Sequence, residues 1–314
     1  MDVTVVGAGV IGLTTAVTLQ ERGHRVRVVA ADTGDAITSS VAGAVWFPYK
    51  VGPPGKVAVW AARTRTWLAE LAETTPEAGV DILTGYEIVP DLTERPWWAG
   101  VPTMEGDQLL AIDRVERRPA PVPGTPLAWE YTAPRAEPAL FLAWLEKLLD
   151  HPIERRTVED LRQERGDAII NCTGLAARDL VDDELLIPLL GQVLVAEPGS
   201  ADLATTVTDD RDPERIFYII PRRDEVILGG CSIPFPPGDA PQISEELSER
   251  IVAQAKALGI GVGAVKRTRV GLRPYRAEVR LEREGRILHN YGHGGAGFTL
   301  CRGCAEDVAD LLSR

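Results

Sequence analysis

The sequence lacks the features of a membrane, secreted or nucleic-acid-binding protein. No apolar run reaches the roughly 18 residues that a membrane-spanning helix needs. The N-terminal residues MDVTVVGAGVIGL contain no basic segment and no plausible cleavage site, so we interpret them as a strand and turn, not a signal peptide. The 34 Lys and Arg residues are outnumbered by 46 Asp and Glu residues, giving a net charge of −12. This acidity argues against nucleic-acid and anionic-membrane partners.

Cysteine is also scarce, because the chain contains four cysteines in 314 residues. This usage suits a reducing cytoplasm, and the C-terminal DLLSR is not a peroxisomal Ser-Lys-Leu signal. Cys301 and Cys304 form a CxxC, but no second CxxC exists and both fall in a predicted helix. We therefore favour a structural role over a redox or metal role. The sequence leaves open whether any of Cys172, Cys231, Cys301 and Cys304 form a disulfide.

The N-terminus contains a nucleotide-binding pattern. Residues 2–6 are β-branched or polar, GAGVIG follows, and the next residues have a helical composition. In a strand–GxGxxG–helix unit, Gly7 makes the tight turn, Gly9 lets a pyrophosphate approach and Gly12 lets the helix pack on the strand. A second strand, RVRVVAAD, ends at Asp32, about 20 residues after the last glycine, where a ribose-binding acid is expected. The pattern indicates a dinucleotide without distinguishing NAD from FAD.

Other segments predict a second kind of structure inserted between nucleotide-binding elements. The Pro-rich and aromatic residues 80–134 and several β-branched runs indicate strands of an antiparallel sheet. We predict helices at 56–73, 137–150 and 243–258, and strands at 167–174, 189–197, 216–230 and 286–292. The order predicts two interleaved domains, a nucleotide-binding domain of 1–50, 135–180 and 264–314 and a second domain of 51–134 and 181–263.

The motifs resemble those of the D-amino-acid oxidase family, the FAD-dependent D-amino-acid and D-aspartate oxidases. GxGxxG is shared by many enzymes, but GLRPYR followed by RLERE and HNYGHGG is far more specific. The matching segments extend over nearly the whole chain: VVGAGVIGL with Asp32, AGAVWFPY, IINCTG, YIIPR, VGLRPYRAEVRLERE and NYGHGGAGFTL.

The resemblance implies an α/β (α+β overall) fold, in which a Rossmann-type FAD-binding domain is interleaved with a substrate domain built on an antiparallel sheet. It also implies oxidative deamination of D-amino acids by non-covalently bound FAD. The products would be a 2-oxo acid, ammonia and H2O2, with O2 as the electron acceptor. The glycine cluster of residues 289–300 would lie against flavin and substrate, and the following helix would point its positive end at the flavin.

The resemblance assigns four residues to the substrate. Arg273 would hold the α-carboxylate bidentately, and the Tyr218 hydroxyl would assist it. The Gly295 carbonyl would receive the amine, and Phe47 would line the pocket. We interpret the neighbouring arginines as ordinary surface residues: Arg276, Arg280, Arg283 and Arg286.

No side chain is expected to act as a catalytic acid or base. In this family the amine is bound neutral and the Cα hydrogen passes as hydride to flavin N5, so the protein supplies positioning and electrostatics. We expect His293 to order the glycine loop. The expected FAD-binding residues are Gly7, Gly9, Val10, Ile11, Gly12, Asp32, Ser39, Ala44, Val45, Val158, Thr173, Gly294, Gly297 and Thr299.

The sequence departs from the family pattern near the substrate. A lid tyrosine expected four residues before Tyr218 is replaced by Glu214, and Phe47 takes a position that is polar in some relatives. Ala44-Val45 replaces the usual Gly-Leu, which makes those FAD contacts less defined. We therefore expect a more open, more apolar pocket that favours neutral or apolar D-amino acids.

Several alternatives stay open. A D-aspartate oxidase would need further cations, for which Arg215 and Arg222 are candidates, and a glycine or sarcosine oxidase shares the same skeleton. A silent cofactor sensor is disfavoured by the presence of Arg273 and Tyr218. An NAD-dependent dehydrogenase is disfavoured because no acid–base residue can be assigned. The expected partners are a D-amino acid, O2 and, as a possible homodimer, a second copy of the chain.

Overall fold

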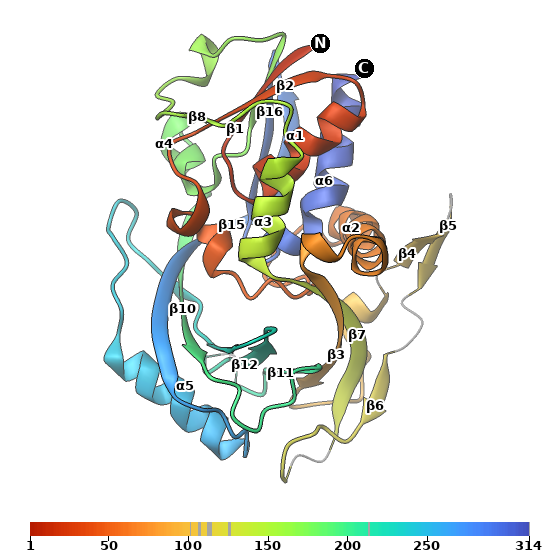
Figure 1. Ribbon diagram of the computed structural model, residues 1–314, viewed down its shortest axis with the longest axis vertical. Coiled ribbons are helices and arrows are strands. Elements are labelled where there is room, and N and C mark those ends of the chain that lie inside the picture. Colours follow the sequence, from red (N-terminus) through yellow and green to blue (C-terminus); the bar gives the residue numbers. More distant parts are fainter. Residues whose placement is uncertain (101, 106–107, 112–114, 125–126, 213, 314) are drawn as a thin grey trace.

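The computed structural model describes residues 1–100, 102–105, 108–111, 115–124, 127–212 and 214–313. Figure 1 shows an elongated molecule with both termini at the same end. The helices of the described residues are α1 (Val10–Glu21), α2 (Pro54–Thr74), α3 (Pro138–Lys147), α4 (Ala177–Leu180), α5 (Glu245–Ala257) and α6 (Gly297–Leu312).

The described strands form a 14-stranded mixed sheet and a separate two-stranded sheet, β4–β5. Along the large sheet the order is β6-β7-β3-β11-β12-β13-β10-β15-β16-β9-β1-β2-β8, and β14 pairs with β10. The bounds are β1 (Asp2–Val6), β2 (Arg25–Ala30), β3 (Val80–Ile88), β4 (Pro102–Glu105), β5 (Gln108–Ala111), β6 (Glu116–Arg118), β7 (Ala128–Ala136), β8 (Glu154–Arg155), β9 (Ala168–Asn171), β10 (Ile187–Ala196), β11 (Thr205–Asp209), β12 (Phe217–Pro221), β13 (Val226–Gly229), β14 (Ile233–Pro234), β15 (Val265–Glu284) and β16 (Ile287–His293).

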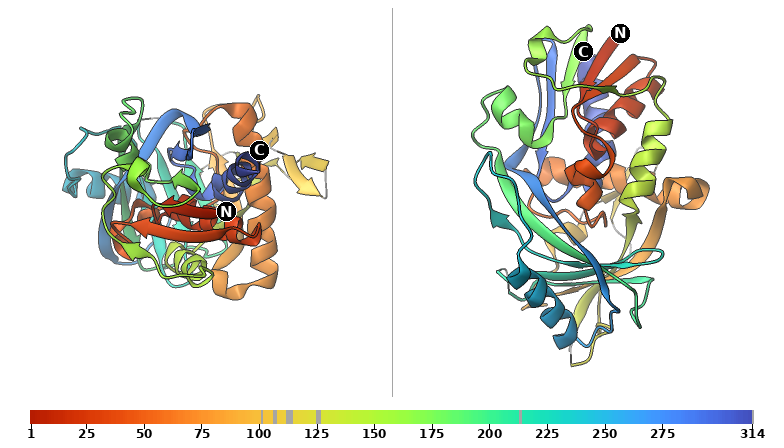
Figure 2. Two further views of the ribbon diagram at one scale, coloured as in Figure 1. Left: turned by 90° about the horizontal axis from the view of Figure 1, so that it is seen from above. Right: turned by 60° about the vertical axis from the view of Figure 1, so that its left-hand side comes forward.

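One end of the sheet has the parallel order of a nucleotide-binding fold. β1 lies between β2 and β9, and β16 continues the parallel pairing beyond β9. Helices α1, α3 and α6 pack together beside these strands, as two views show (Figures 1 and 2). Helix α1 is buried from Val10 to Leu19 because the sheet and two helices cover it, so its sequence has no polar face in this stretch.

The other end of the sheet is mostly antiparallel. β12, β13 and β10 form successive antiparallel pairs, whereas β11 pairs with β3 in parallel. Helix α5 packs on this part through buried Ile251 and Ala255. Its N-cap is Ser244, whose hydroxyl accepts from the Leu247 N–H at 3.2 Å, and Glu245 and Glu246 in its first turn suit the helix dipole.

Strands β10 and β15 join the two ends of the sheet. The first half of β15 pairs with all of β10, from Val265 to Tyr275, and its second half pairs with β16 from Arg280 to Glu284. Figures 1 and 2 show these strands curving along the length of the molecule. The predicted division into two domains stays a prediction. If it holds, β15 would pair with strands of both domains.

The mixed α/β class and the main helices and strands confirm the sequence-based expectations. The expected antiparallel sheet is present and contains one parallel pair, β3–β11. One expectation needs correction. We expected four surface arginines, but the Arg276 and Arg280 side chains are each only 19% exposed. Arg280 donates to the Tyr291 hydroxyl at 2.9 Å and Arg286 to three backbone carbonyl groups, while Arg283 is exposed as expected.

Two further findings bear on the expectations from composition. Within the described part of the chain, none of the helices is long and apolar enough to cross a bilayer. The four cysteines are free thiols, and all four are buried. Burial raises the pKa of the Cys172 thiol to about 12 and that of Cys301 to about 11, which makes both thiols unreactive.

Candidate active site

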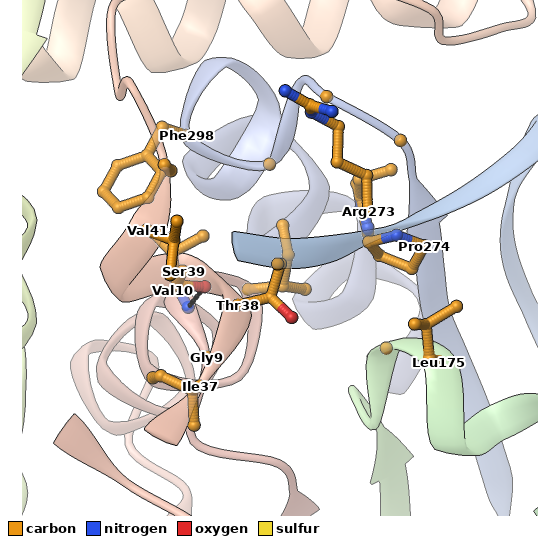
Figure 3. Close-up of a pocket in the computed structure, with 18 of the residues that line it drawn as sticks. Gly9, Val10, Ile37, Thr38, Ser39, Val41, Leu175, Arg273, Pro274 and Phe298 are labelled. Atoms are coloured by element: carbon orange, nitrogen blue, oxygen red, sulfur yellow. Dashed lines mark hydrogen bonds between the residues drawn. The ribbon is translucent and has the colours of Figure 1, made fainter. Parts of the chain in front are cut away.

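A cavity of about 510 Å³ lies where the two ends of the sheet meet, and it brings together most of the predicted site residues. Arg273 and Pro274 lie at one end of it, on β15, while Gly9 and Ile37 lie at the other (Figure 3). The predicted residues that line it are Gly7, Gly9, Val10, Ile11, Asp32, Ser39, Ala44, Val45, Phe47, Val158, Thr173, Tyr218, Arg273, Gly294, Gly295 and Gly297. Gly12 and Thr299 are not part of its lining.

Gly7 and Gly12 allow the first turn to pack closely. Gly7 has φ +115°, which favours glycine, and a Cβ there would collide with the Cys172 carbonyl oxygen. A Cβ at Gly12 would collide with the carbonyl oxygen of Gly7. Gly12 therefore acts from behind the cavity by bringing α1 against the turn, as the sequence pattern predicts.

Gly9 has a different environment, because its open side faces the cavity. A Cβ at Gly9 would meet only the Ser39 Oγ, at 3.1 Å. That hydroxyl accepts a hydrogen bond from the Val10 N–H at 3.0 Å, drawn as a dashed line in Figure 3. The N-cap residue Gly9 has no side chain to cap α1, so the N–H groups of its first turn other than that of Val10 stay available to a ligand.

A second helix N-terminus points to the same cavity. Gly297 and Phe298, the first residues of α6, line it, and the preceding Ala296 provides no side-chain cap. Two helices of 12 and 16 residues therefore direct their positive ends and unpaired N–H groups to one space. Such an arrangement stabilises an anionic ligand at two separate points.

Asp32 and Thr173 lie at the nucleotide end of the cavity. Asp32 is exposed and forms no hydrogen bond or ion pair with any residue that the structure describes. The Thr173 hydroxyl donates to Asn171 Oδ1 at 2.7 Å, and the buried Val158 is a further member of the lining. The free Asp32 carboxylate can accept hydrogen bonds from ribose hydroxyl groups without losing a contact of its own.

The glycine cluster is explained in part by the protein itself. Gly294 has φ +54°, and a Cβ there would collide with the Lys50 carbonyl oxygen. A Cβ at Gly295 would lie 2.7 Å from Tyr49 Cδ1. The segment around Tyr49 thus packs directly on the cluster, and both line the cavity.

Arg273 offers an unpaired cation to the cavity. Its NH1 group donates to the carbonyl oxygens of Cys231 at 2.9 Å and Leu190 at 3.3 Å, and it forms no ion pair with a described carboxylate. A Cβ at Gly191, on the facing strand β10, would come within 2.5–2.8 Å of the guanidinium and would displace it. The remaining N–H donors of Arg273 can bind a carboxylate in the fork geometry of guanidinium groups.

Tyr218 lies beside this cation. Its ring covers Gly229 and Gly230, where a Cβ would collide with the ring. Burial raises the pKa of the Tyr218 phenol, and the Arg273 guanidinium opposes that effect. The phenol is therefore neutral and can donate a hydrogen bond to the ligand that Arg273 binds.

The sequence missed two polar residues in the lining, Tyr49 and Asp210. The buried Tyr49 hydroxyl and the Asp210 Oδ1 atom have no hydrogen-bond partner among the described residues. Burial and the Asp209 charge raise the pKa of Asp210 to about 6. The presence of Phe47 suggested an apolar pocket, but Tyr49 and Asp210 make part of its lining polar. Tyr49 lies two residues after Phe47 in VWFPY, whereas Asp210 has no motif.

His293 and Thr299 have supporting positions. His293 lines the cavity but is only 3% exposed, and burial lowers its pKa to about 3. A neutral imidazole in this position fits the expectation that it does not act as a titrating base near neutral pH. Thr299 Oγ1 accepts from the Phe47 N–H at 3.1 Å and donates to the Phe47 carbonyl at 3.0 Å, so it positions Phe47 instead of lining the cavity.

The two candidate cations for an acidic side chain lie elsewhere. Arg222 is only 4% exposed and donates to the carbonyl groups of Ala42 and Gly43 at 3.0 and 2.7 Å. Arg215 is exposed, and neither arginine belongs to the cavity lining. Glu214, which replaces the expected lid tyrosine, is also exposed and outside the lining.

Comparison with known proteins agrees with this geometry. A family model described as FAD dependent oxidoreductase matches residues 2–311. The D-amino-acid oxidase of Rubrobacter xylanophilus is 37% identical over 98% of this chain and 94% of its own length, and that of Streptomyces coelicolor is 39% identical over 99% and 97%. The human D-aspartate oxidase is 31% identical over 99% and 94%. Among solved structures, glycine oxidase from Bacillus cereus has a TM-score of 0.77 at 19% identity, covering 99% of this chain and 97% of that one.

The chain belongs to the FAD-dependent oxidoreductase family, and FAD is its cofactor. The cavity fits this cofactor on three observations. The backbone at Gly9 is open to the cavity, the N-termini of two helices face it with free N–H groups, and the Asp32 carboxylate is free. These groups suit the pyrophosphate, the flavin and the ribose of a dinucleotide.

Asp32→Ala tests the nucleotide end of the site. Loss of one charge-assisted hydrogen bond, which contributes about 1.5–3 kcal/mol, should weaken FAD binding by about 10- to 150-fold. Folding should be unaffected because Asp32 has no partner among the described residues. The measurement is the dissociation constant of FAD from flavin fluorescence. Asp35→Ala is the control, since Asp35 is 95% exposed and outside the lining. Equal affinities in both variants would exclude a role for Asp32.

Proposed function

We propose that the chain catalyses the oxidative deamination of D-amino acids to 2-oxo acids and ammonia, with O2 as the electron acceptor and H2O2 as a product. The observation that carries the proposal is the unpaired Arg273 guanidinium beside Tyr218 in the cavity wall. It occurs in a chain 37% and 39% identical to two D-amino-acid oxidases over nearly its whole length. A carboxylate-binding pair in an FAD enzyme supports an amino acid as the substrate.

The roles of the residues follow from their chemistry. Arg273 binds the α-carboxylate with paired N–H donors, Tyr218 donates a further hydrogen bond, and the Gly295 carbonyl accepts from the amine. Fixing both polar groups leaves one direction for the Cα–H bond, which sets the stereochemistry. Bound FAD supplies the hydride acceptor. The first N–H groups of α6 stabilise negative charge that develops next to them.

Proton transfer from carbon is not required of any side chain. The imidazole in the lining, His293, stays neutral at physiological pH because burial lowers its pKa to about 3. The positions of Tyr218 and Arg273 suit binding, and burial raises the pKa of the Tyr218 phenol, which keeps it neutral. We therefore infer that the chain accelerates the reaction by positioning and electrostatics.

The cavity favours neutral over acidic side chains. In the described lining the arginines are Arg273 and Arg156, and both Arg156 NH groups are engaged by Glu164 at 2.6–2.7 Å. A side-chain carboxylate would therefore lack a second free cation, and it would lie near the Asp210 carboxyl. This arrangement disfavours D-aspartate oxidation, the second candidate function.

The cellular setting is proposed from composition. Four buried free thiols and the acidic charge of −12 are compatible with the cytoplasm. A homodimer is proposed as the assembled state, and sedimentation of the purified holoprotein measures it directly.

The function is tested by anaerobic reduction of the bound flavin. We expect the yellow protein to bleach with D-valine and not with L-valine, and to release H2O2 in air from the D-enantiomer. FAD should be released on denaturation, as expected of a non-covalent cofactor. Equal rates with both enantiomers, or a requirement for a nicotinamide, would refute the proposal.

Arg273→Ala tests the residue that carries the proposal. Truncating one partner of a charge-assisted pair costs about 2–5 kcal/mol, so kcat/KM should fall by about 30-fold to several thousand-fold. Arg273→Lys should recover only part of this, because it restores the charge without the fork. FAD should stay bound in both variants.

The control for this test is Arg283→Ala. Arg283 is an exposed arginine of the same strand that donates to the carbonyl groups of Gly285 and Leu311, outside the cavity. It should retain the original kcat/KM. An Arg273→Ala variant with similarly retained activity would remove Arg273 from the substrate site.

A further inference from the structure

A second cavity adjoins the first and has a volume of about 590 Å³. Phe47, Tyr49 and Asp210 line both cavities, so these residues form the boundary between them. The second cavity is therefore a continuation of the substrate site beyond Phe47. Its size is within the usual range of small-molecule sites, about 300–1,000 Å³.

The walls of the second cavity are acidic. Four carboxyl groups line it, against one ammonium group, that of Lys50. Lys50 Nζ donates to Ser232 Oγ at 3.1 Å. The carboxyl groups are those of Glu87, Asp91, Glu94 and Asp210.

Two of these carboxyl groups have a buried oxygen atom and no counter-charge. Glu87 is 6% exposed, and its Oε2 atom has no hydrogen-bond partner among the described residues. Asp210 is half-buried, and its buried Oδ1 atom likewise has no hydrogen-bond partner among the described residues. Neither residue forms an ion pair with a described cation. The two lie on neighbouring strands, since Asp210 N–H donates at 2.9 Å to the carbonyl of Ile88, the residue after Glu87.

Both of these carboxyl groups have raised pKa values. Burial and the Asp210 charge raise the pKa of Glu87 to about 8, and burial and the Asp209 charge raise that of Asp210 to about 6. A bound cation would stabilise both ionised forms. Buried carboxylates without a partner are costly, so their placement in a cavity wall suits a cationic ligand.

Aromatic rings complete the wall. Five aromatic side chains line the second cavity: Phe47, Tyr49, Trp97, Trp98 and Trp129. The rings of Phe47 and Trp98 are 5.4 Å apart between centroids and meet edge to face. Ring faces attract ammonium and guanidinium groups, and the attraction is strongest for tryptophan. Carboxylates and aromatic rings in one cavity are complementary to a cation on an aliphatic stem.

We propose that the second cavity binds the cationic side chain of a basic D-amino acid, with Glu87 and Asp210 as its counter-charges and the aromatic rings around its stem. The α-carboxylate would remain on Arg273, so the substrate would span both cavities with opposite charges at its two ends. The inference rests on the proposed D-amino-acid oxidation and extends its substrates from neutral to basic side chains.

The test compares D-arginine with D-citrulline, which has nearly the same shape but no side-chain charge. The wild-type holoenzyme should prefer D-arginine in kcat/KM by about tenfold or more, as expected for a desolvated cation near carboxylate and ring. The preference should lie in KM and not in kcat, because the reacting carbon is the same. In Glu87→Gln and Asp210→Asn the ratio should fall toward one.

Asp209→Asn is the matched control. Asp209 is adjacent to Asp210, pairs with Arg211 at 2.7 Å and lines neither cavity. Because the Asp209 charge raises the pKa of Asp210, the comparison is made above about pH 8, where both cavity carboxyl groups are ionised, and Asp209→Asn should then keep the preference for D-arginine. Preference retained in both cavity variants, or no preference in the wild-type enzyme, would overturn the inference.

The pH profile of the wild-type enzyme gives a reading that does not depend on any variant. The raised pKa values mean that both carboxyl groups are neutral at low pH and ionise as pH rises through about 6 for Asp210 and about 8 for Glu87. The ratio of kcat/KM for D-arginine to kcat/KM for D-citrulline should therefore rise over this pH range. The other titratable and charged groups around the pair are Asp91, Glu94, Asp209, Tyr49, Tyr131 and Lys50. A ratio that stays constant or falls would contradict the inference.

The outcomes separate the two proposals. Oxidation of D-valine with no preference for D-arginine refutes the second-cavity inference alone. Failure of every D-amino acid to reduce the flavin refutes the proposed function, and the inference is refuted with it.

Discussion

The pairing of strands β10 and β15 is the constraint on which the rest of the structure depends. It connects the parallel strands of the nucleotide end to the antiparallel strands of the other end, and it positions Arg273 opposite Leu189 in the wall between them. Gly191, on the same stretch of β10, leaves room for the guanidinium. A displacement of this pair would therefore change the substrate site and the cofactor site together.

The cavity is organised by charge. Two helix N-termini give the cofactor end a positive potential, and Arg273 adds a full charge at the far end of the same space (Figure 3). Beyond Arg273 the sign changes at Asp210 and Glu87. Tyr49 lines both cavities; burial raises the pKa of its phenol, and the charges of Arg273 and Asp210 act on that pKa in opposite directions. A zwitterion with a further cation on its side chain matches this sequence of charges.

Much of the nucleotide end could be predicted because its chemistry depends on local backbone geometry. Gly7, Gly9 and Gly12 have distinct steric environments, and each agrees with the role that the motif gives it. Asp32 was predicted from spacing alone and is exposed and free in the cavity wall. The placement of these residues agrees with the expectation, and their contacts with FAD stay predictions.

The missed features depend on long-range packing. Asp210 and Glu87 come together only because β11 pairs with β3 in parallel, a pairing between segments more than a hundred residues apart that no local pattern encodes. Arg276 and Arg280 were predicted to be surface residues because the sequence of β15 is rich in charge, but β16 and Tyr291 cover them. The sequence predicted that Gly294 and Gly295 are glycines because a cofactor lies against them. Their contacts with residues 49–50 also explain why a side chain would not fit there.

The central claim is that the Arg273 charge receives the carboxylate of the substrate. Propionate carries that carboxylate without an amine to oxidise, and propionamide has the same shape without charge. We predict that propionate perturbs the flavin spectrum of the holoprotein and propionamide does not. Gly191→Ala, which crowds the guanidinium, should weaken propionate binding while FAD stays bound. Equal binding of propionate and propionamide, or unchanged propionate affinity in Gly191→Ala, would contradict the account.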